Sequence, residues 1–268
     1  MAATSRFLND NQWLKIAPLL PSEKPGSKGG RPRADNRAVL EGILWILRTG
    51  APWQDLPKRY PSPSTCWRRL KAWEEQDLWL KIWRTFLSLL DAEGLLDWEE
   101  AFIDASFAPA KKGATASARP KRGKGSKWLV VVDGQGVPLG GAIASASPAE
   151  VTLAETTLRT IKVPRQGRGR PKTRPKRLIA DKAYDSDKLR DKLGERGIRL
   201  LVPYRRNRKH RRQQAGEVKA RYKRRWKIER TFAWLGNFRR LVVRYERLAL
   251  VYLAFFHLAC IIIALRQF

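Results

Sequence analysis

The first hundred residues show the hydrophobic periodicity of helices. Apolar side chains recur every three or four positions between residues 38 and 47, with Asp35 before the run and Gly50 after it. This spacing predicts a helix that Asp35 caps and Gly50 ends. Residues 61–76 and 77–94 repeat the pattern. The first part of the chain is therefore predicted to be all-helical.

The second of these helices is rich in arginine and follows the turn APWQDLP; it is predicted to begin near Ser62 or Ser64. Two helices joined by a turn suggest a helix-turn-helix arrangement, in which the second helix enters a groove of DNA. In that geometry the groove would be met by Ser64, Thr65, Arg68, Arg69 and Lys71. A small helical bundle with a tryptophan-rich core explains the same pattern, and the two interpretations are compatible.

From about Trp98 the pattern changes to strands alternating with helices. The segment WEEAFIDASFAPA indicates a strand that carries Asp104, and residues 127–145 form an apolar hairpin around a Gly-rich turn. The elements predicted next are a helix, a strand that runs into Asp181, a helix, a strand and a helix, over 148–161, 178–180, from 186, 197–204 and 216–235. This order is that of an RNase H-like fold, an α/β fold with a mixed sheet flanked by helices.

The last apolar segment, Leu248–Leu265, contains 18 residues and no charge. That length is the lower limit for a membrane-spanning helix. We favour a buried helix, because His257 at its centre could find a hydrogen-bond partner inside a protein but not in lipid. We therefore expect three parts: a helical domain over 1–97, an α/β domain over 98–247, and an apolar helix over 248–268 on the core or at a dimer interface.

Charge indicates the partner. The chain has a net charge of +30 and a pI of about 10.9, and almost all of the excess lies after residue 100. A field of this sign favours a polyanion, most commonly nucleic acid, although a ribosomal-type protein shares the composition. Residues 111–127, 162–177 and 205–212 contain no acidic side chain. We expect these runs to be mobile loops that give phosphate affinity rather than sequence recognition.

Cysteine and histidine offer little chemistry. Cys66 and Cys260 stand far apart, which fits a reducing compartment and excludes a zinc cluster built on paired cysteines. The two histidines, His210 and His257, do not support a histidine-based mechanism. The N-terminus has no apolar signal segment. We expect a cytoplasmic protein associated with the nucleoid.

Three acidic residues carry the candidate chemistry. Asp104 has apolar neighbours, Asp181 follows a buried-looking strand, and Glu229 lies in a strongly basic helix. A carboxylate among apolar groups is costly unless it binds a cation or another partner. Several carboxylates that converge can hold a pair of Mg²⁺ ions, which activate the attacking oxygen and stabilise the leaving oxygen.

Each of the three also has a structural explanation. Asp104 could form a structural salt bridge, Asp181 could cap the next turn, and Glu229 could pair with Arg225 four residues before it. Asp133 is the main competitor for a catalytic role, but its DGQG setting indicates a hairpin-turn residue. The agreement of fold order, charge and position favours the catalytic interpretation.

The segments FIDASF, LIADKAYDSD and RYKRRWKIERTFAWLGNFRRL resemble the three acidic motifs of bacterial insertion-sequence transposases of the DDE class, in particular those of insertion-sequence family five. Residues 40–76 resemble the N-terminal domain of that group. The related pattern Tyr-x2-Arg-x3-Glu-x6-Lys is matched at Tyr222, Arg225 and Glu229. Its final Lys is replaced by Gly236, and Arg239 or Arg240 is the substitute one turn further on.

The resemblance implies an enzyme that cuts DNA at the terminal inverted repeats of an insertion sequence and joins the freed 3′-OH to target DNA. It implies two Mg²⁺ ions, for which Mn²⁺ can substitute, held by Asp104, Asp181 and Glu229. Arg225 would contact phosphate near the cut and Tyr222 would position its neighbours. The implied partners are double-stranded DNA and at least one further copy of the chain. Two alternatives remain: a non-catalytic, domesticated DNA-binding protein, and a structure-selective nuclease of the same fold.

Overall fold

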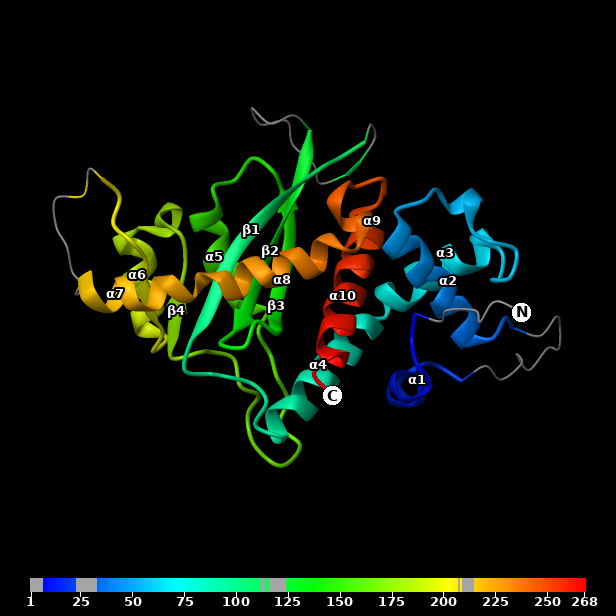
Figure 1. Ribbon diagram of the computed structural model, residues 1–268, viewed down its shortest axis with the longest axis horizontal. Coiled ribbons are helices and arrows are strands. Elements are labelled where there is room, and N and C mark those ends of the chain that lie inside the picture. Colours follow the sequence, from blue (N-terminus) through cyan, green and yellow to red (C-terminus); the bar gives the residue numbers. More distant parts are fainter. Residues whose placement is uncertain (1–6, 23–32, 112–113, 116–123, 207, 209–214) are drawn as a thin grey trace.

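The computed structural model describes residues 7–22, 33–111, 114–115, 124–206, 208 and 215–268 (Figure 1). His210, much of the first and third basic runs, and most of the Gly/Pro/Lys loop at 21–33 lie outside these residues.

The centre of the fold is a five-stranded sheet. Its strands are β1 (Ala101–Pro109), β2 (Gly125–Asp133), β3 (Pro138–Ser145), β4 (Arg177–Ile179) and β5 (Arg199–Leu201), in the spatial order β3-β2-β1-β4-β5. The first three strands pair antiparallel, whereas β4 and β5 run parallel to β1. The mixed sheet and the RNase H-like order of its elements confirm the predicted fold class.

Helices flank this sheet. They are α5 (Glu150–Arg159), α6 (Asp187–Glu195), α7 (Ala215–Tyr222), α8 (Trp226–Gly236) and the short α9 (Arg239–Val242). The helix predicted over 216–235 is interrupted, because a 3₁₀ turn at Lys223–Arg225 separates α7 from α8. The two helices run across the strands in Figure 1. The predicted apolar stripe docks α8: Ile228 and Leu235 are buried, and Phe232 packs against Trp128.

The N-terminal part is helical, as predicted. It contains α1 (Asp10–Ile16), a 3₁₀ turn (Ala17–Leu19), α2 (Asn36–Thr49), a second 3₁₀ turn (Trp53–Asp55), α3 (Pro63–Glu75) and α4 (Leu78–Ala92). The side chain of Asp35 accepts a hydrogen bond from the Ala38 amide over 2.7 Å, and Ser62 caps α3. Gly50 ends α2 with a φ of 72°, a conformation that favours glycine.

The C-terminal helix α10 (Ala249–Leu265) stands between the N-terminal helices and the sheet (Figure 1). It packs against α4, α3 and β3. Nδ1 of His257 lies 3.0 Å from Oε1 of the buried Glu74 on α3. The helix is therefore core of this chain, and its central histidine has the protein partner that we expected. Among the described residues, no helix is both long enough and apolar enough to cross a membrane.

One hydrophobic cluster joins the N-terminal helices, the sheet and α10. Trp83 of α4 shows this continuity: its ring lies edge-on to Phe256 of α10, and its Nε1 donates to the Pro138 carbonyl at the start of β3. The domain boundaries near 97 and 247 stay predictions.

Candidate active site

Asp104 lies in the middle of β1, the central strand, where its side chain is 17% exposed. Its Oδ1 accepts from the Ala105 amide, and its Oδ2 accepts from Nη2 of Arg225. Burial raises the pKa of Asp104 and outweighs the opposing effect of the Arg225 charge, while the charge of Asp181 raises it further. The two aspartates are thus close enough to affect each other, as expected from the parallel pairing of β1 with β4.

Asp181 lies two residues after the end of β4. Its Oδ1 accepts from the Lys182 amide over 2.6 Å at the start of a 3₁₀ turn (Lys182–Tyr184), so the capping role considered from the sequence is real. The same oxygen accepts from the Tyr222 hydroxyl over 3.3 Å. Asp181 can therefore cap the 3₁₀ turn and belong to the candidate site at the same time.

Glu229 lies on α8 and is the most exposed of the three acids, with 63% of its side chain accessible. Nη1 of Arg225 lies 3.9 Å from its Oε1 and also donates to the Tyr222 hydroxyl over 3.4 Å. Asp104 and Tyr222 together raise the pKa of Arg225 above its ordinary value, against the lowering effect of burial. Arg225 and Tyr222 thereby link all three predicted acids.

The donor set suits a hard cation, but the carboxylates are not gathered around one point. In the part of the chain that the structure describes, no group of three or more acidic, histidine or cysteine side chains could hold a metal ion. The cationic head of Arg225 lies between Asp104 and Glu229. The carboxylate oxygens fit Mg²⁺ by their chemistry, and bringing Glu229 toward Asp104 requires Arg225 to move aside.

Asp133 is a turn residue, as predicted. It is fully buried, and its carboxylate accepts from the amides of Asp97, Gln135 and Val137. Burial raises its pKa to about 6 against the effect of these hydrogen bonds. This carboxylate holds the β2–β3 turn and is not available to a ligand.

The two arginines suggested as substitutes for the missing lysine differ. Arg239 is exposed, whereas Arg240 is buried. Arg240 donates to Glu246 over 2.6 and 2.9 Å and to the carbonyls of Gly50 and Ala51. These contacts hold Arg240 within the fold and join α9 to the residues that follow α2, so Arg239 is the better placed of the two for phosphate; a phosphate contact by either arginine stays a prediction.

The residues proposed for DNA recognition on α3 also differ in how exposed they are. Ser64 and Arg68 are exposed on α3 and, with Trp53, Pro63 and Trp67, line an open hollow of about 370 Å³. Thr65 is half-buried, and its hydroxyl lies 2.9 Å from that of Ser62.

Two further members of that group have partners within the chain. Arg69 donates to Asn36 over 2.5 Å, and Lys71 pairs with Glu75 over 2.7 Å. On α3, Ser64 and Arg68 are consequently the better placed of the predicted residues to meet DNA.

Part of the second basic run is anchored. Val163 pairs with Lys172 in an isolated antiparallel bridge, and Arg174 donates to the Arg196 carbonyl over 2.7 Å. Lys172 and Lys176 pair with Asp91 and Glu99. The expectation of a wholly mobile loop is wrong for these positions, because acids on other elements bind the bases.

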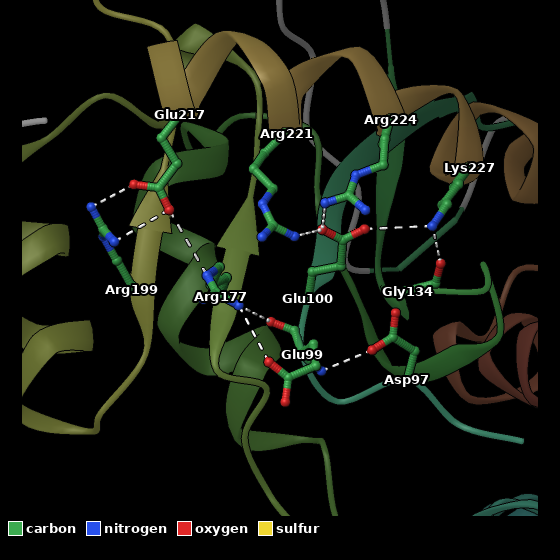
Figure 2. A network of polar contacts seen from close by, with 10 residues as sticks. All are labelled: Asp97, Glu99, Glu100, Gly134, Arg177, Arg199, Glu217, Arg221, Arg224 and Lys227. Carbon is green, nitrogen blue, oxygen red and sulfur yellow. Dashed lines mark hydrogen bonds and ion pairs between the residues drawn. The ribbon is translucent and has the colours of Figure 1, made fainter. Parts of the chain in front are cut away.

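A buried acid that the sequence did not single out lies beside this site. Glu100, just before β1, is only 1% exposed and pairs with Arg221, Arg224 and Lys227 (Figure 2). The three bases recur at spacings of three along the chain, which indicates one helical face. The spacing of these bases was the signal available in the sequence, but it does not identify the acid that pairs with them.

Two family models together match most of the chain. Residues 8–83 match the family model described as a putative transposase of the IS4/5 family, and residues 99–264 match the transposase DDE domain. The chain is 38% identical over 149 residues to a putative transposase for insertion sequence element IS402 of Burkholderia cepacia, covering 56% of this chain and 65% of that protein.

It is also 40% identical over 104 residues to an uncharacterized 16.2 kDa protein of the same insertion element, covering 37% of this chain and 71% of that protein. A solved structure of piggyBac transposase, in a synaptic complex with hairpin DNA, is similar in fold at 10% identity, with a TM-score of 0.50 over 96% of this chain and 69% of that one. The chain belongs to the DDE transposases, and its N-terminal part resembles that of the IS4/5 family of insertion-sequence transposases.

Proposed function

We propose that this chain cuts DNA at the terminal inverted repeats of an insertion sequence and joins the freed 3′-OH to target DNA. Asp104, Asp181 and Glu229 are the catalytic carboxylates of this proposal. The observation that carries it is the linkage of all three acids through Arg225 and Tyr222 at one place on an RNase H-like sheet.

The residues that surround the acids have separate roles. Arg225 is a cation placed among the carboxylates, and a planar guanidinium binds phosphate as it binds carboxylate, frequently through two parallel hydrogen bonds. When DNA enters, we expect Arg225 to exchange its pairing with Asp104 for a phosphate oxygen. The Tyr222 hydroxyl contacts both Asp181 and Arg225, so it holds these two side chains near each other while Arg225 exchanges its partner.

The three carboxylates would hold two Mg²⁺ ions, or Mn²⁺ in their place. When bound, such a pair activates the attacking oxygen and stabilises the leaving oxygen of a phosphodiester. The chain itself supplies oxygen ligands at the ends or middle of rigid elements: β1 for Asp104, the end of β4 for Asp181 and α8 for Glu229. Rigid elements hold such ligands more accurately than loops do.

The net charge of +30 supports double-stranded DNA as the partner. Ser64 and Arg68 on α3 are proposed to read the terminal repeats, while Arg239 and the basic runs contact phosphates. Two element ends have to be brought together, so a homodimer or larger assembly on DNA is proposed. A protein with this partner would be found on the bacterial nucleoid.

A strand-transfer assay tests the proposal. Purified protein is mixed with Mg²⁺, a duplex that carries the element end and a supercoiled target plasmid, and joined products are counted. The proposal expects cleavage followed by joining. Cleavage without joining would favour a structure-selective nuclease, and binding without cleavage would favour a non-catalytic DNA-binding protein; both results contradict the proposed function.

A further inference from the structure

Glu100 is an acid in a position that is costly unless it is well paired. It is 1% exposed and lies just before β1, four residues before Asp104. Burying a lone carboxylate is strongly unfavourable, so its surroundings have to supply compensating charge. Figure 2 shows Glu100 at the centre of a network, with bases above it.

The compensating charge comes from the continuous segment formed by α7, the 3₁₀ turn and α8. Arg224 and Arg221 lie 2.6 and 3.1 Å from Oε2 of Glu100, and Lys227 lies 3.4 Å from Oε1. Lys227 also donates to the carbonyl of Gly134 in the β2–β3 turn. Bases from α7, from the 3₁₀ turn and from α8 thus converge on a single residue just before β1.

The N-terminal end of the same helical face is attached to the sheet as well. Glu217 of α7 pairs with Arg199 of β5 over 2.6 Å and lies 3.9 Å from Arg177 of β4. Arg177 in turn lies 3.3 Å from Glu99. This polar face, made of residues 217, 221, 224 and 227, holds the helix across the strands β5, β4 and β1 (Figure 2).

The next residues in the sequence are those of the active site. Tyr222 follows Arg221, and Arg225 follows Arg224. Successive residues point about 100° apart in an α-helix and about 120° apart in a 3₁₀ turn, so the polar face and the active-site face are fixed relative to each other. A shift of the polar face by one residue would turn Tyr222 and Arg225 away from Asp181 and Asp104.

We propose that Glu100 is a positioning residue for catalysis: by collecting Arg221, Arg224 and Lys227, it sets the register in which α7 and α8 present Tyr222, Arg225 and Glu229 to the aspartates. This inference rests on the proposed function of those residues. Glu100 itself touches neither substrate nor metal. Its effect is carried by the helix.

The test compares Glu100→Gln with Glu99→Gln. Glu99 is the adjacent acid, with a side chain 56% exposed. It pairs with Lys176 and Arg177 and meets the helix only indirectly, because Arg177 lies 3.9 Å from Glu217. Glu100→Gln leaves three converging cations without a counter-charge. We expect the cleavage rate at saturating DNA to fall by about 100-fold, the effect of misplacing a reacting group by roughly 1 Å. The Kd for DNA should be nearly unchanged, and Glu99→Gln should cleave normally.

Amide hydrogen exchange supplies a second measurement that needs no catalysis. In Glu100→Gln the amides of 215–236 should exchange faster, while those of α10 keep their wild-type protection. The double variant Glu100→Gln/Arg224→Gln has one cation fewer and should recover part of the protection and of the cleavage rate. Glu100→Asp, which keeps the charge, should lie between Glu100→Gln and the wild type.

Three results would overturn the inference: normal cleavage by Glu100→Gln, unchanged exchange in 215–236, or faster exchange throughout the protein, which indicates a purely structural residue. If the wild type itself does not cleave DNA, the proposed function fails. The exchange measurement on 215–236 then still decides whether Glu100 sets the register of the helix.

Discussion

The Tyr222 hydroxyl donates a hydrogen bond to Oδ1 of Asp181 over 3.3 Å and so connects the end of α7 to the end of β4. The two residues are 41 positions apart in the sequence. The hydroxyl also accepts from Arg225 over 3.4 Å, which extends the connection toward Asp104. Tyr222 therefore packs against the core and also connects the predicted catalytic acids.

Tyr222→Phe removes only this junction. A hydrogen bond to a charged group contributes about 1.5–3 kcal/mol, so we expect cleavage to fall by about tenfold or more, with little change in thermal stability. Tyr245→Phe is the matched control, because Tyr245 is 46% exposed. Equal cleavage rates for the wild type and Tyr222→Phe would show that the hydroxyl does not orient Asp181 or Arg225.

Arg225→Gln separates metal binding from catalysis. The guanidinium occupies space beside Asp104 and Glu229 that a bound cation would use. Without this competing charge, the protein alone should bind Mn²⁺ more tightly in a calorimetric titration, while DNA cleavage should be largely lost. Arg159→Gln, an exposed arginine of α5 that pairs with Glu155 outside the site and the basic runs, should change neither quantity. Weaker Mn²⁺ binding by Arg225→Gln would contradict the displacement of Arg225.

Much of the fold could be predicted because its signals are local. Asp35, Ser62 and Ser186 cap helices where the sequence placed them, and Asp133 holds the predicted turn. The burial of α10 followed from its uniform apolarity, since a helix hydrophobic on all sides needs partners on all sides. The order of the elements predicted a mixed sheet flanked by helices.

Long-range polar contacts could not be predicted in the same way. Arg240 and Arg239 are adjacent and chemically identical, yet only Arg240 is buried against Glu246 and the end of α2. Glu99 and Glu100 form a similar pair. Successive side chains of an extended segment point in opposite directions, so one of the two is buried, but the sequence does not identify the bases with which it pairs. The 3₁₀ turn at Lys223–Arg225 was missed because the segment has no Pro or Gly to mark it.

Stability should depend on pH through Asp133. Its folded-state pKa is about 6, above the ordinary value of 3.8, because burial disfavours its charged form. The unfolded chain therefore loses this proton first, and the free energy of unfolding should fall as pH rises from about 4 to about 6. Above that range the loss is constant, on the order of 3 kcal/mol.

Asp133→Asn cannot ionise, so the difference in unfolding free energy between variant and wild type should shift in favour of the variant across that pH range. Urea titrations from pH 4 to pH 7 measure it, and taking the difference cancels the other titrating groups. A difference that is independent of pH would contradict the raised pKa of Asp133.

Arg68→Ala tests the recognition role of α3. Arg68 is exposed beside Ser64 at the open hollow near Trp67. If Arg68 contacts a base, the variant should lose about 1–3 kcal/mol of binding to terminal-repeat DNA and much less to a scrambled duplex. Lys81→Ala, an exposed base on α4, is the control. An equal loss on both duplexes would make Arg68 a phosphate contact without a role in recognition.

The central claim is that Asp104, Asp181 and Glu229 perform the chemistry, and the most direct measurement is the cleavage of terminal-repeat DNA in Mg²⁺ by Asp104→Asn, Asp181→Asn and Glu229→Gln. Glu195→Gln, an exposed acid at the end of α6, is the control. Each of the three variants should bind DNA with nearly wild-type affinity and show no detectable cleavage, while the control cleaves normally. Near-normal cleavage by any one of the three would contradict the assignment of that residue.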